Sequence, residues 1–288
     1  LATLAAQAKM SVIDLASAIV EIANENMASA IKMVSLERGY DPRRFALFAF
    51  GGAGPLHAAA VARALRIPQV LVPMFPGNAS ALGMLLADLR VDKVWTKAFR
   101  SSRIDAGLVS QQFAAIRTSA EDELRSEGFT GEPVVAYAIS MRYAGQNYEH
   151  HVPVSERVID DAALQDAFDA FERIHAERYG YAIAGEEIEL VAFHVTVSGQ
   201  RDTPRLQAPL GTDVDPHPPS RLVHFRGLGD VAAAVYRRYD LPAGSSIDGP
   251  CVIEEPGSTT LVEPGMSVTV LPDGQLLIDA RTSERGNA

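Results

Sequence analysis

A group of three closely spaced glycines is the first feature of the sequence that could do chemistry. Gly51, Gly52 and Gly54 follow the apolar run at residues 45–50, and His57 comes three residues after the last of them. Glycine has no Cβ, so a ligand can approach the backbone, and the free N–H groups of a helix that starts here favour negative charge. The spacing matches neither G-x-x-x-x-G-K-[ST] nor G-x-G-x-x-G. The segment therefore predicts either a nucleotide contact or a tight turn without a ligand.

The imidazole of His57 is the candidate catalytic group. In the first turn of a helix it could point at a phosphate or substrate oxygen, and it could donate or accept a proton near neutral pH. The alternative is that His57 caps the helix or packs against a neighbouring element. The sequence leaves both interpretations open.

Three polar residues near a predicted hairpin are candidates for substrate binding: Arg142, Gln146 and Glu149. The planar guanidinium of an arginine can hold a carboxylate or a phosphate with two hydrogen bonds. The alternative, which we favour, pairs Arg142 with Glu149 across the hairpin and lets Gln146 bond the turn, because one hairpin offers such pairing locally.

The remaining histidines do not predict a metal site. His150 and His151 are neighbours, so on a strand they point to opposite faces and cannot bind one metal together; we expect both at the surface. His175 and Arg178 suit the negative C-terminal end of a helix. The sequence has no H-x-x-x-H or H-E-x-x-H pattern and a single cysteine, so we expect no metal site from these side chains alone.

Several carboxylates are expected to have structural or solvated positions. Glu254, Glu255 and Glu263 lie near predicted turns, where solvation is the simplest interpretation. Asp88 is expected at the end of a helix, as a capping or interlobe residue.

Composition narrows the class of partner. The formal net charge of −10 leaves no basic surplus for nucleic acid or an anionic membrane, so we expect neither partner. Cys251 is the single cysteine and cannot form an internal disulfide, which fits a reducing, cytoplasmic location. The apolar run at 45–62 is interrupted by glycines, a proline and a histidine, which argues against a spanning helix.

Residues 1–90 predict alternating strands and helices. Ser11 and Asp14 form a capping pattern before an apolar stripe with steps of three and four, and Gly39 is placed to end that helix. Residues 45–50 predict a central strand covered on both faces, and 56–65 predict a helix. A second strand at 69–73 and a helix from Asn78 to Asp88 follow, so we expect a parallel α/β sheet.

The rest of the chain predicts three further segments. Residues 91–200 show the order β-α-β-β-α-β, with helices expected to begin at Asp105 and Asp160, and this order is typical of a ferredoxin-like α+β domain. Residues 201–220 are rich in proline and predict a linker. Residues 221–288 contain short strand-like runs separated by turn signals, which predict a small all-β module.

Several separate stretches resemble the hydantoinase A and 5-oxoprolinase family, which also includes a subunit of acetone carboxylases. They are RGYDPRRF at 38–45, AFGGAGPLHA at 49–58, VLVPMFPGNASALGMLLAD at 70–88, MRYAGQNYEHHVPV at 141–154, FERIHAERYGYA at 171–182 and GPCVIEEPGSTTLVEPG at 249–265. The resemblance extends over almost the whole chain. Two positions depart from it: His150 stands where the family pattern has an aliphatic residue, and Cys251 where it has a small alanine.

The resemblance implies an actin-like, ribonuclease H-like ATPase lobe at residues 1–90. By position, Gly51, Gly52 and Gly54 would pack against the adenosine of ATP, which binds with Mg²⁺ in the complete protein. Such enzymes use ATP to phosphorylate an amide or ketone oxygen, and a partner subunit of the hydantoinase B type often assists. The expected activity is ring-opening hydrolysis of a small cyclic amide.

The resemblance also implies that residue 1 falls midway through the ATPase domain. We therefore expect a C-terminal portion that does not hydrolyse ATP alone. Two alternatives stay open: a subunit of an acetone carboxylase-like complex, and a non-catalytic scaffold that docks the partner subunit. In the scaffold alternative, self-association into a homo-oligomer would cover exposed apolar surface.

Overall fold

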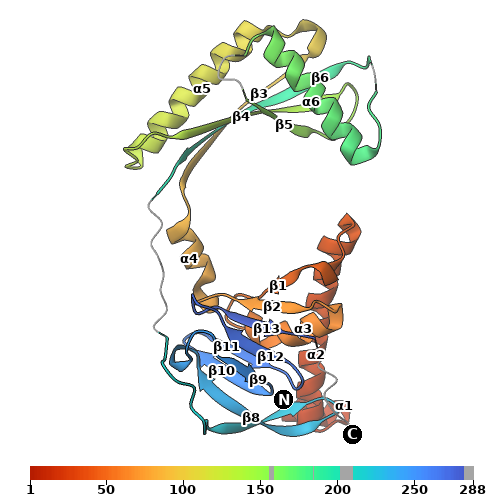
Figure 1. Ribbon diagram of the computed structural model, residues 1–288. Helices are drawn as coiled ribbons and strands as arrows, with labels where there is room; N and C mark the ends of the chain where they lie inside the picture. Colours follow the sequence, from red (N-terminus) through yellow and green to blue (C-terminus); the bar gives the residue numbers. More distant parts are fainter. Residues whose placement is uncertain (156–158, 184, 202–209, 282–288) are drawn as a thin grey trace. The chain divides into compact units, whose positions relative to one another are not determined.

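The computed structural model describes residues 1–155, 159–183, 185–201 and 210–281 (Figure 1). The chain divides into two compact units: a first unit of Leu1–Leu85 with Pro204–Ala288, and a second unit of Leu86–Thr203. Residues 202–209 of the expected linker lie outside the described residues. The two units are described one at a time.

The first unit begins with two helices, α1 (Ala2–Ala8) and α2 (Val12–Ser35). The predicted cap is confirmed, because the Asp14 backbone N–H donates to Ser11 Oγ at 3.0 Å, and Gly39 in the left-handed region ends the following turn η1 (Leu36–Arg38). The apolar stripe is covered only in part: Ala28 is buried, whereas Ile13 and Val34 are about half exposed. Among the described residues no single helix could span a membrane; only the pair of α1 and the α2 segment, bent by 90° between them, has the length and composition.

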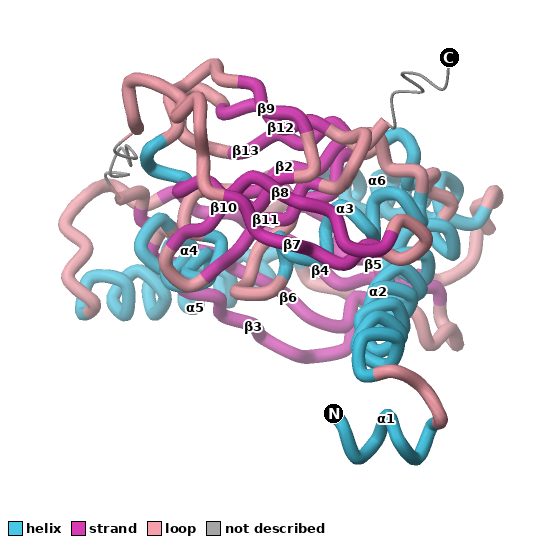
Figure 2. The backbone as a smooth tube through the Cα atoms, turned by 90° about the horizontal axis from the view of Figure 1, so that it is seen from below, coloured by secondary structure: helices cyan, strands magenta, loops and turns pink. Residues whose placement is uncertain are grey.

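A five-stranded sheet joins the two ends of the sequence within this unit. Its order is β1 (Ala46–Phe48), β2 (Gln69–Val72), β13 (Leu276–Asp279), β12 (Ser267–Val270) and β9 (Ser246–Asp248). β1 and β2 are parallel, as expected, whereas β13 pairs antiparallel with β2, and Figure 2 shows β2, β13, β12 and β9 side by side. The prediction of a separate all-β module at 221–288 is therefore wrong, because three of its strands complete the N-terminal sheet.

The first strand is not the central strand that the sequence predicts. β1 lies at an edge of the sheet and, among the described residues, pairs on one side only. Phe48 is 52% exposed, and Phe45 and Phe50 are similarly open. Apolar residues on both faces are typical of a strand that other elements cover on both faces. The residue types show that this segment is apolar, but they do not show which elements pack beside it.

The unit also contains a second sheet and several helical segments. The sheet order is β11 (Ser258–Val262), β10 (Cys251–Glu255), β8 (Gly229–Arg237) and β7 (Ser220–Phe225), and η5 (Arg238–Asp240) follows β8. Further helical segments are η2 (Pro42–Arg44), α3 (Gly54–Leu65) and η3 (Pro76–Asn78). One core unites α3 and both sheets through Ala59, Val70, Ile253, Val268 and Leu276. Cys251 is fully buried, and burial raises the pKa of its thiol to about 12, so it acts as a small apolar group.

The helix expected from Asn78 to Asp88 is shorter than predicted. It is α4 (Ala79–Leu86), and Asn78 belongs to the preceding turn η3. Asp88 lies beyond the helix in the second unit, where its Oδ1 accepts a hydrogen bond from the Arg201 N–H at 3.1 Å. The expected capping of α4 by Asp88 is therefore wrong.

The second unit has the predicted order β-α-β-β-α-β. Its elements are β3 (Leu89–Arg100), η4 (Ser101–Arg103), α5 (Ala106–Ser126), β4 (Val134–Tyr143), β5 (His150–Val154), α6 (Asp161–Tyr179) and β6 (Ile188–Gly199). The strand order β3-β6-β4-β5 puts the second and fourth strands in the centre, whereas a ferredoxin-like sheet has the first and third there. Element order could be predicted from the sequence, but the pairing of distant strands could not.

Both helices of the second unit cover the same face of its antiparallel sheet (Figure 1). Asp105 and Asp160 cap α5 and α6 by accepting backbone N–H bonds, as their positions in the sequence predict. The core between helices and sheet contains Phe113, Phe171 and Phe193, all fully buried.

Candidate functional site

The glycine turn connects β1 to α3. Gly51 is in the left-handed region, with φ of 87°, and its N–H donates to Pro76 O at 2.7 Å. A Cβ added to Gly51 would meet no heavy atom of the described residues within 4 Å. The backbone at Gly51 therefore faces open space, as a ligand contact requires.

Gly52 has a different reason to be glycine. A Cβ there would lie 3.2 Å from Gly257 O, in the turn between β10 and β11, and a Cβ on Gly77 would lie 2.6 Å from the same atom. Three loops thus meet backbone to backbone. A Cβ on Gly54 would make only an ordinary contact, 3.8 Å from Ala49 C. The two interpretations of the glycine turn apply to different residues: Gly52 serves packing, and Gly51 is open.

This close approach predicts a stability difference between two glycine-to-alanine variants. Gly77→Ala is expected to lower the free energy of unfolding by about 1–3 kcal/mol, since the backbone of the facing turn must move. Gly54→Ala, in the same unit and free of that clash, is expected to stay within about 0.5 kcal/mol. Urea unfolding followed by circular dichroism measures both. Equal stabilities would contradict the contact with Gly257.

His57 contacts the neighbouring helix. Its Nδ1 lies 2.8 Å from Asn24 Oδ1 on α2, and the pair is partly buried. This hydrogen bond ties the first turn of α3 to α2, which is the packing alternative. A catalytic role for His57 stays a prediction.

A buried ion pair lies next to the three meeting loops, and no sequence pattern predicts it. Arg238 Nη1 lies 2.6 Å from Glu255 Oε1, and both side chains are fully buried. Arg238 Nη2 also donates to Val72 O at 3.1 Å and to Gly274 O at 2.9 Å, so one guanidinium joins the ends of β2, β10 and the β12–β13 turn. Burial raises the pKa of Glu255, and Arg238 opposes that shift. The expectation that Glu255 is solvated is wrong.

The other two glutamates of this region differ from each other. Glu263 is buried, pairs with Arg63 of α3, and has its pKa raised by burial, so the expectation of a solvated side chain is wrong there too. Glu254 is partly exposed and pairs with Arg221 across the second sheet at 2.9 Å. Glu254 and Glu255 are adjacent on β10, so their side chains point to opposite faces, and only Glu255 is fully buried.

In the second unit, Arg142 is paired rather than free. Its Nε donates to Glu189 Oε2 at 3.0 Å, and its Nη1 lies 3.7 Å from Glu149 Oε1. The pairing of Arg142 with Glu149 that the sequence favours is thus observed, with Glu189 on β6 as the nearer partner. The Gln146 N–H bonds Tyr143 O at 3.0 Å within the hairpin turn. Substrate contacts by these residues stay a prediction.

The two adjacent histidines do point to opposite faces of the sheet. His151 is exposed, and its ring lies 4.6 Å from that of His194, whose Nε2 is 2.9 Å from Ser140 Oγ. His150, however, is only 4% exposed, so the prediction that it lies at the surface is wrong. Its ring contacts Phe171 and His175 under α6.

Burial of His150 predicts a pH-dependent stability. Burial, with smaller repulsion from His175 and Arg178, lowers the pKa of His150, so the unfolded chain binds the proton more readily. The free energy of unfolding is therefore expected to be at its full value above pH ~6.5 and to fall as the pH drops below that. His150→Leu should reduce this pH dependence. Part of it should remain, because burial also lowers the pKa of His194. Urea unfolding curves recorded between pH 5 and 8 test the prediction, and a pH dependence that His150→Leu leaves unchanged would contradict it.

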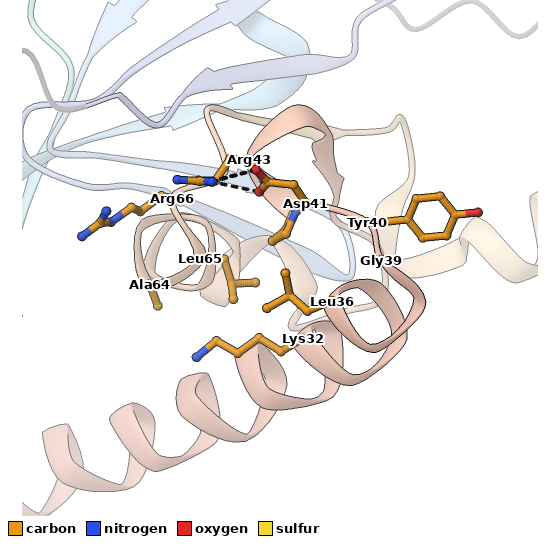
Figure 3. Close-up of a pocket in the computed structure, with 10 residues that line it drawn as sticks. Lys32, Leu36, Gly39, Tyr40, Asp41, Arg43, Ala64, Leu65 and Arg66 are labelled. Atoms are coloured by element: carbon orange, nitrogen blue, oxygen red, sulfur yellow. Dashed lines mark hydrogen bonds and ion pairs between the residues drawn. The ribbon is translucent and has the colours of Figure 1, made fainter.

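A cavity of about 500 Å³ opens at the other end of α3 (Figure 3). Lys32, Arg43 and Arg66 line it together with the apolar Leu65, and Arg43 forms an ion pair with Asp41 at 2.8 Å. That bond lowers the pKa of Asp41. α3 has 12 residues, so Arg66 lies about 18 Å along the helix from the glycine turn. The cavity is therefore separate from the glycine turn.

A nucleotide at the glycine turn stays a prediction. The backbone at Gly51 is open, which is compatible with a ligand there. No cluster of three or more His, Cys, Asp or Glu side chains suited to a metal ion occurs within the described ranges.

Two family models match this chain. The model described as hydantoinase/oxoprolinase matches residues 1–93, and the model described as the hydantoinase/oxoprolinase C-terminal domain matches residues 99–281. The chain belongs to the hydantoinase/oxoprolinase family. The family resemblance of the separate sequence stretches is thereby confirmed.

Relatives with named activities are similar over most of the chain. Caprolactamase subunit alpha of Pseudomonas jessenii is 31% identical over 262 residues, covering 88% of this chain and 38% of that protein. 5-Oxoprolinase 1 of Arabidopsis thaliana is 28% identical over 277 residues, covering 94% of this chain and 21% of the relative. The chain thus spans well under half the length of these family members.

Two solved structures share the mixed α/β fold with several sheets. The ATP-dependent caprolactamase from Pseudomonas jessenii superposes with a TM-score of 0.73 at 30% identity, covering 95% of this chain and 41% of that one. Acetone carboxylase in its nucleotide-free form gives a TM-score of 0.76 at 19% identity, with the same coverage of 95% and 41%. The second likeness concerns the fold alone.

Proposed function

We propose that this chain is part of an ATP-dependent hydrolase subunit that phosphorylates the carbonyl of a small cyclic amide and so prepares the ring for opening by water. The observation that carries the proposal is the 31% identity to caprolactamase subunit alpha across 88% of the chain. ATP with Mg²⁺ is the proposed cofactor. Its adenosine would lie against the open backbone of Gly51, with Gly52 and Gly54 forming the rest of the turn.

A partner subunit is part of the proposal. The relative is named subunit alpha, which supports a multi-subunit enzyme, and we propose a partner of the hydantoinase B type. We also propose a cytoplasmic location, since Cys251 is a free, buried thiol.

The test is substrate-dependent ADP formation by the longer protein that contains this segment, together with its partner. Hydantoin, 5-oxoproline and caprolactam are offered separately, and acetone with bicarbonate serves as the carboxylase alternative. ADP release that requires one of the cyclic amides would support the proposal. ADP release with acetone and bicarbonate alone would overturn it. The 288-residue chain by itself is expected to show no turnover.

The exposed aromatic residues in and next to β1 favour a second candidate function. Phe45, Phe48 and Phe50 are each about half exposed along a sheet edge, and large exposed apolar surface is typical of an interaction site. In this alternative the chain docks a partner subunit and binds no ligand of its own. Calorimetric titration with ATP discriminates: heat of binding supports the enzyme, and its absence together with stable oligomers supports the scaffold.

A further inference from the structure

A second pocket lies in the second unit, where two distant sequence motifs meet. Its volume is about 360 Å³, and it is lined by Gln146, Asn147, Tyr148, His175, Tyr179 and Tyr181. The first three residues belong to the turn between β4 and β5, and the other three to the end of α6 and the loop after it. The two family-like stretches at 141–154 and 171–182 thus form one concave surface.

The end of α6 places three aromatic rings around this pocket. Gly180 caps the helix in the left-handed region, with φ of 84°, which reverses the chain between Tyr179 and Tyr181. Their rings lie 4.8 and 5.2 Å from the ring of His175. Tyr148, from the hairpin turn, is 75% exposed. Aromatic walls of this kind suit a flat ligand.

Hydrogen bonding fixes what His175 offers to the pocket. Its Nδ1 lies 2.8 Å from Tyr181 O, and a carbonyl only accepts, so Nδ1 is the donor. In the neutral ring Nε2 is then an acceptor. Gln146 and Asn147 each add an amide that donates and accepts. The six lining residues include no carboxylate, ammonium or guanidinium group.

A buried histidine in contact with two of the lining residues has a polar atom without a partner among the described residues. His150 is 4% exposed, and its Nε2 is buried with no hydrogen-bond partner among the described residues. Its ring lies 5.6 Å from His175 and 5.5 Å from Tyr179, two of the lining residues. Buried polar groups in native proteins are nearly always paired, so an unpaired one beside a pocket indicates a site whose partner is missing.

We propose that this pocket binds a neutral, planar cyclic amide. A ring amide presents an N–H donor next to a carbonyl acceptor, which matches the His175 Nε2 acceptor and the amide N–H donors of Gln146 and Asn147. The tyrosine rings cover the faces of the ligand. This inference rests on the proposed function for the class of ligand. It adds where the ligand binds, and that the pocket prefers uncharged rings to rings that carry a carboxylate.

The test measures binding of hydantoin, caprolactam and 5-oxoproline to the 288-residue chain by NMR titration, without nucleotide. Hydantoin, which is flat and uncharged, is expected to bind more tightly than 5-oxoproline, which carries a charge, and than caprolactam, whose seven-membered ring is puckered. Tyr148→Ala and Tyr181→Ala are each expected to weaken binding about 3- to 10-fold, the effect of losing one aromatic contact. Tyr40→Ala is the matched control, because Tyr40 is exposed and lies in the first unit.

The outcomes separate this inference from the proposed function. Absence of binding by the folded chain, or equal binding by the variants and the control, would overturn the pocket assignment even if the longer protein hydrolyses ATP with a cyclic amide. Binding that the two tyrosine variants weaken supports the pocket, even if ATP-dependent turnover fails.

Discussion

Arg238→Ala is expected to lower the free energy of unfolding by about 3–5 kcal/mol, because it leaves Glu255 as an uncompensated charge in the interior. Arg238 and Glu255 are both fully buried and 2.6 Å apart. The same guanidinium also donates to Val72 O and Gly274 O, and these two carbonyls would lose a donor. Unfolding in guanidinium chloride, followed by circular dichroism, measures the loss of stability.

Two further measurements make this prediction specific. Arg237→Ala, at the exposed neighbouring position, should change stability by less than about 0.5 kcal/mol. The deficit of Arg238→Ala should shrink as the pH falls, since the raised pKa of Glu255 lets the buried carboxyl become neutral in the folded state. A loss that matches Arg237→Ala at all pH values would contradict the buried pair.

Phe193→Ala is expected to cost about 3–5 kcal/mol in the second unit. Phe193 is fully buried on β6, and its ring lies 4.9 Å from Trp95, 5.8 Å from Phe113 and 6.0 Å from Phe99. The substitution removes the ring on which three others pack and leaves a cavity between sheet and helices. Trp95 is the single tryptophan of the chain, so its fluorescence reports unfolding of this unit.

A control in the same sheet isolates the cavity effect. Val134→Ala, at a largely exposed position on β4, should change the transition by less than about 0.5 kcal/mol. If Phe193→Ala unfolds at the same denaturant concentration as Val134→Ala, Phe193 is not at the centre of this core.

Local features of the fold could be predicted from the sequence. Ser11, Asp105 and Asp160 cap the helices that their positions indicate, because a cap depends on residues within one turn. The order of elements in the second unit follows from periodicity for the same reason. Such signals depend on residues within a few positions of one another, so they do not predict which strands pair when the strands are far apart in the sequence.

The errors concern contacts between distant segments. β13 pairs with β2 across about two hundred residues, and no local pattern shows that pairing. The sequence around Glu255 is that of a solvated residue near a turn, but in the fold Glu255 pairs with Arg238 in the interior. The sequence around Arg238 does not indicate burial either, because Arg238 lies between Arg237 and Tyr239.

The candidate site was predictable in part. The glycine turn was found from residue types, but only the structure separates Gly52, which packs against Gly257, from Gly51, which faces open space. His57 looked catalytic because of its distance from the glycines, yet its observed partner is Asn24. The pocket around Tyr148 and Tyr181 was missed, although both motifs that form it were visible in the sequence.

The proposed nucleotide contact at Gly51 is tested most directly by the affinity of the longer protein for ATP after substitution of Gly51. Gly51→Val fills the open space beside the backbone, and Gly227→Val is matched to it, with a φ of 82° and the same open surroundings in the β7–β8 turn. Equilibrium binding of a fluorescent ATP analogue should fall at least tenfold for Gly51→Val and stay at the wild-type value for Gly227→Val. Equal affinity of the two folded variants would contradict a nucleotide at Gly51.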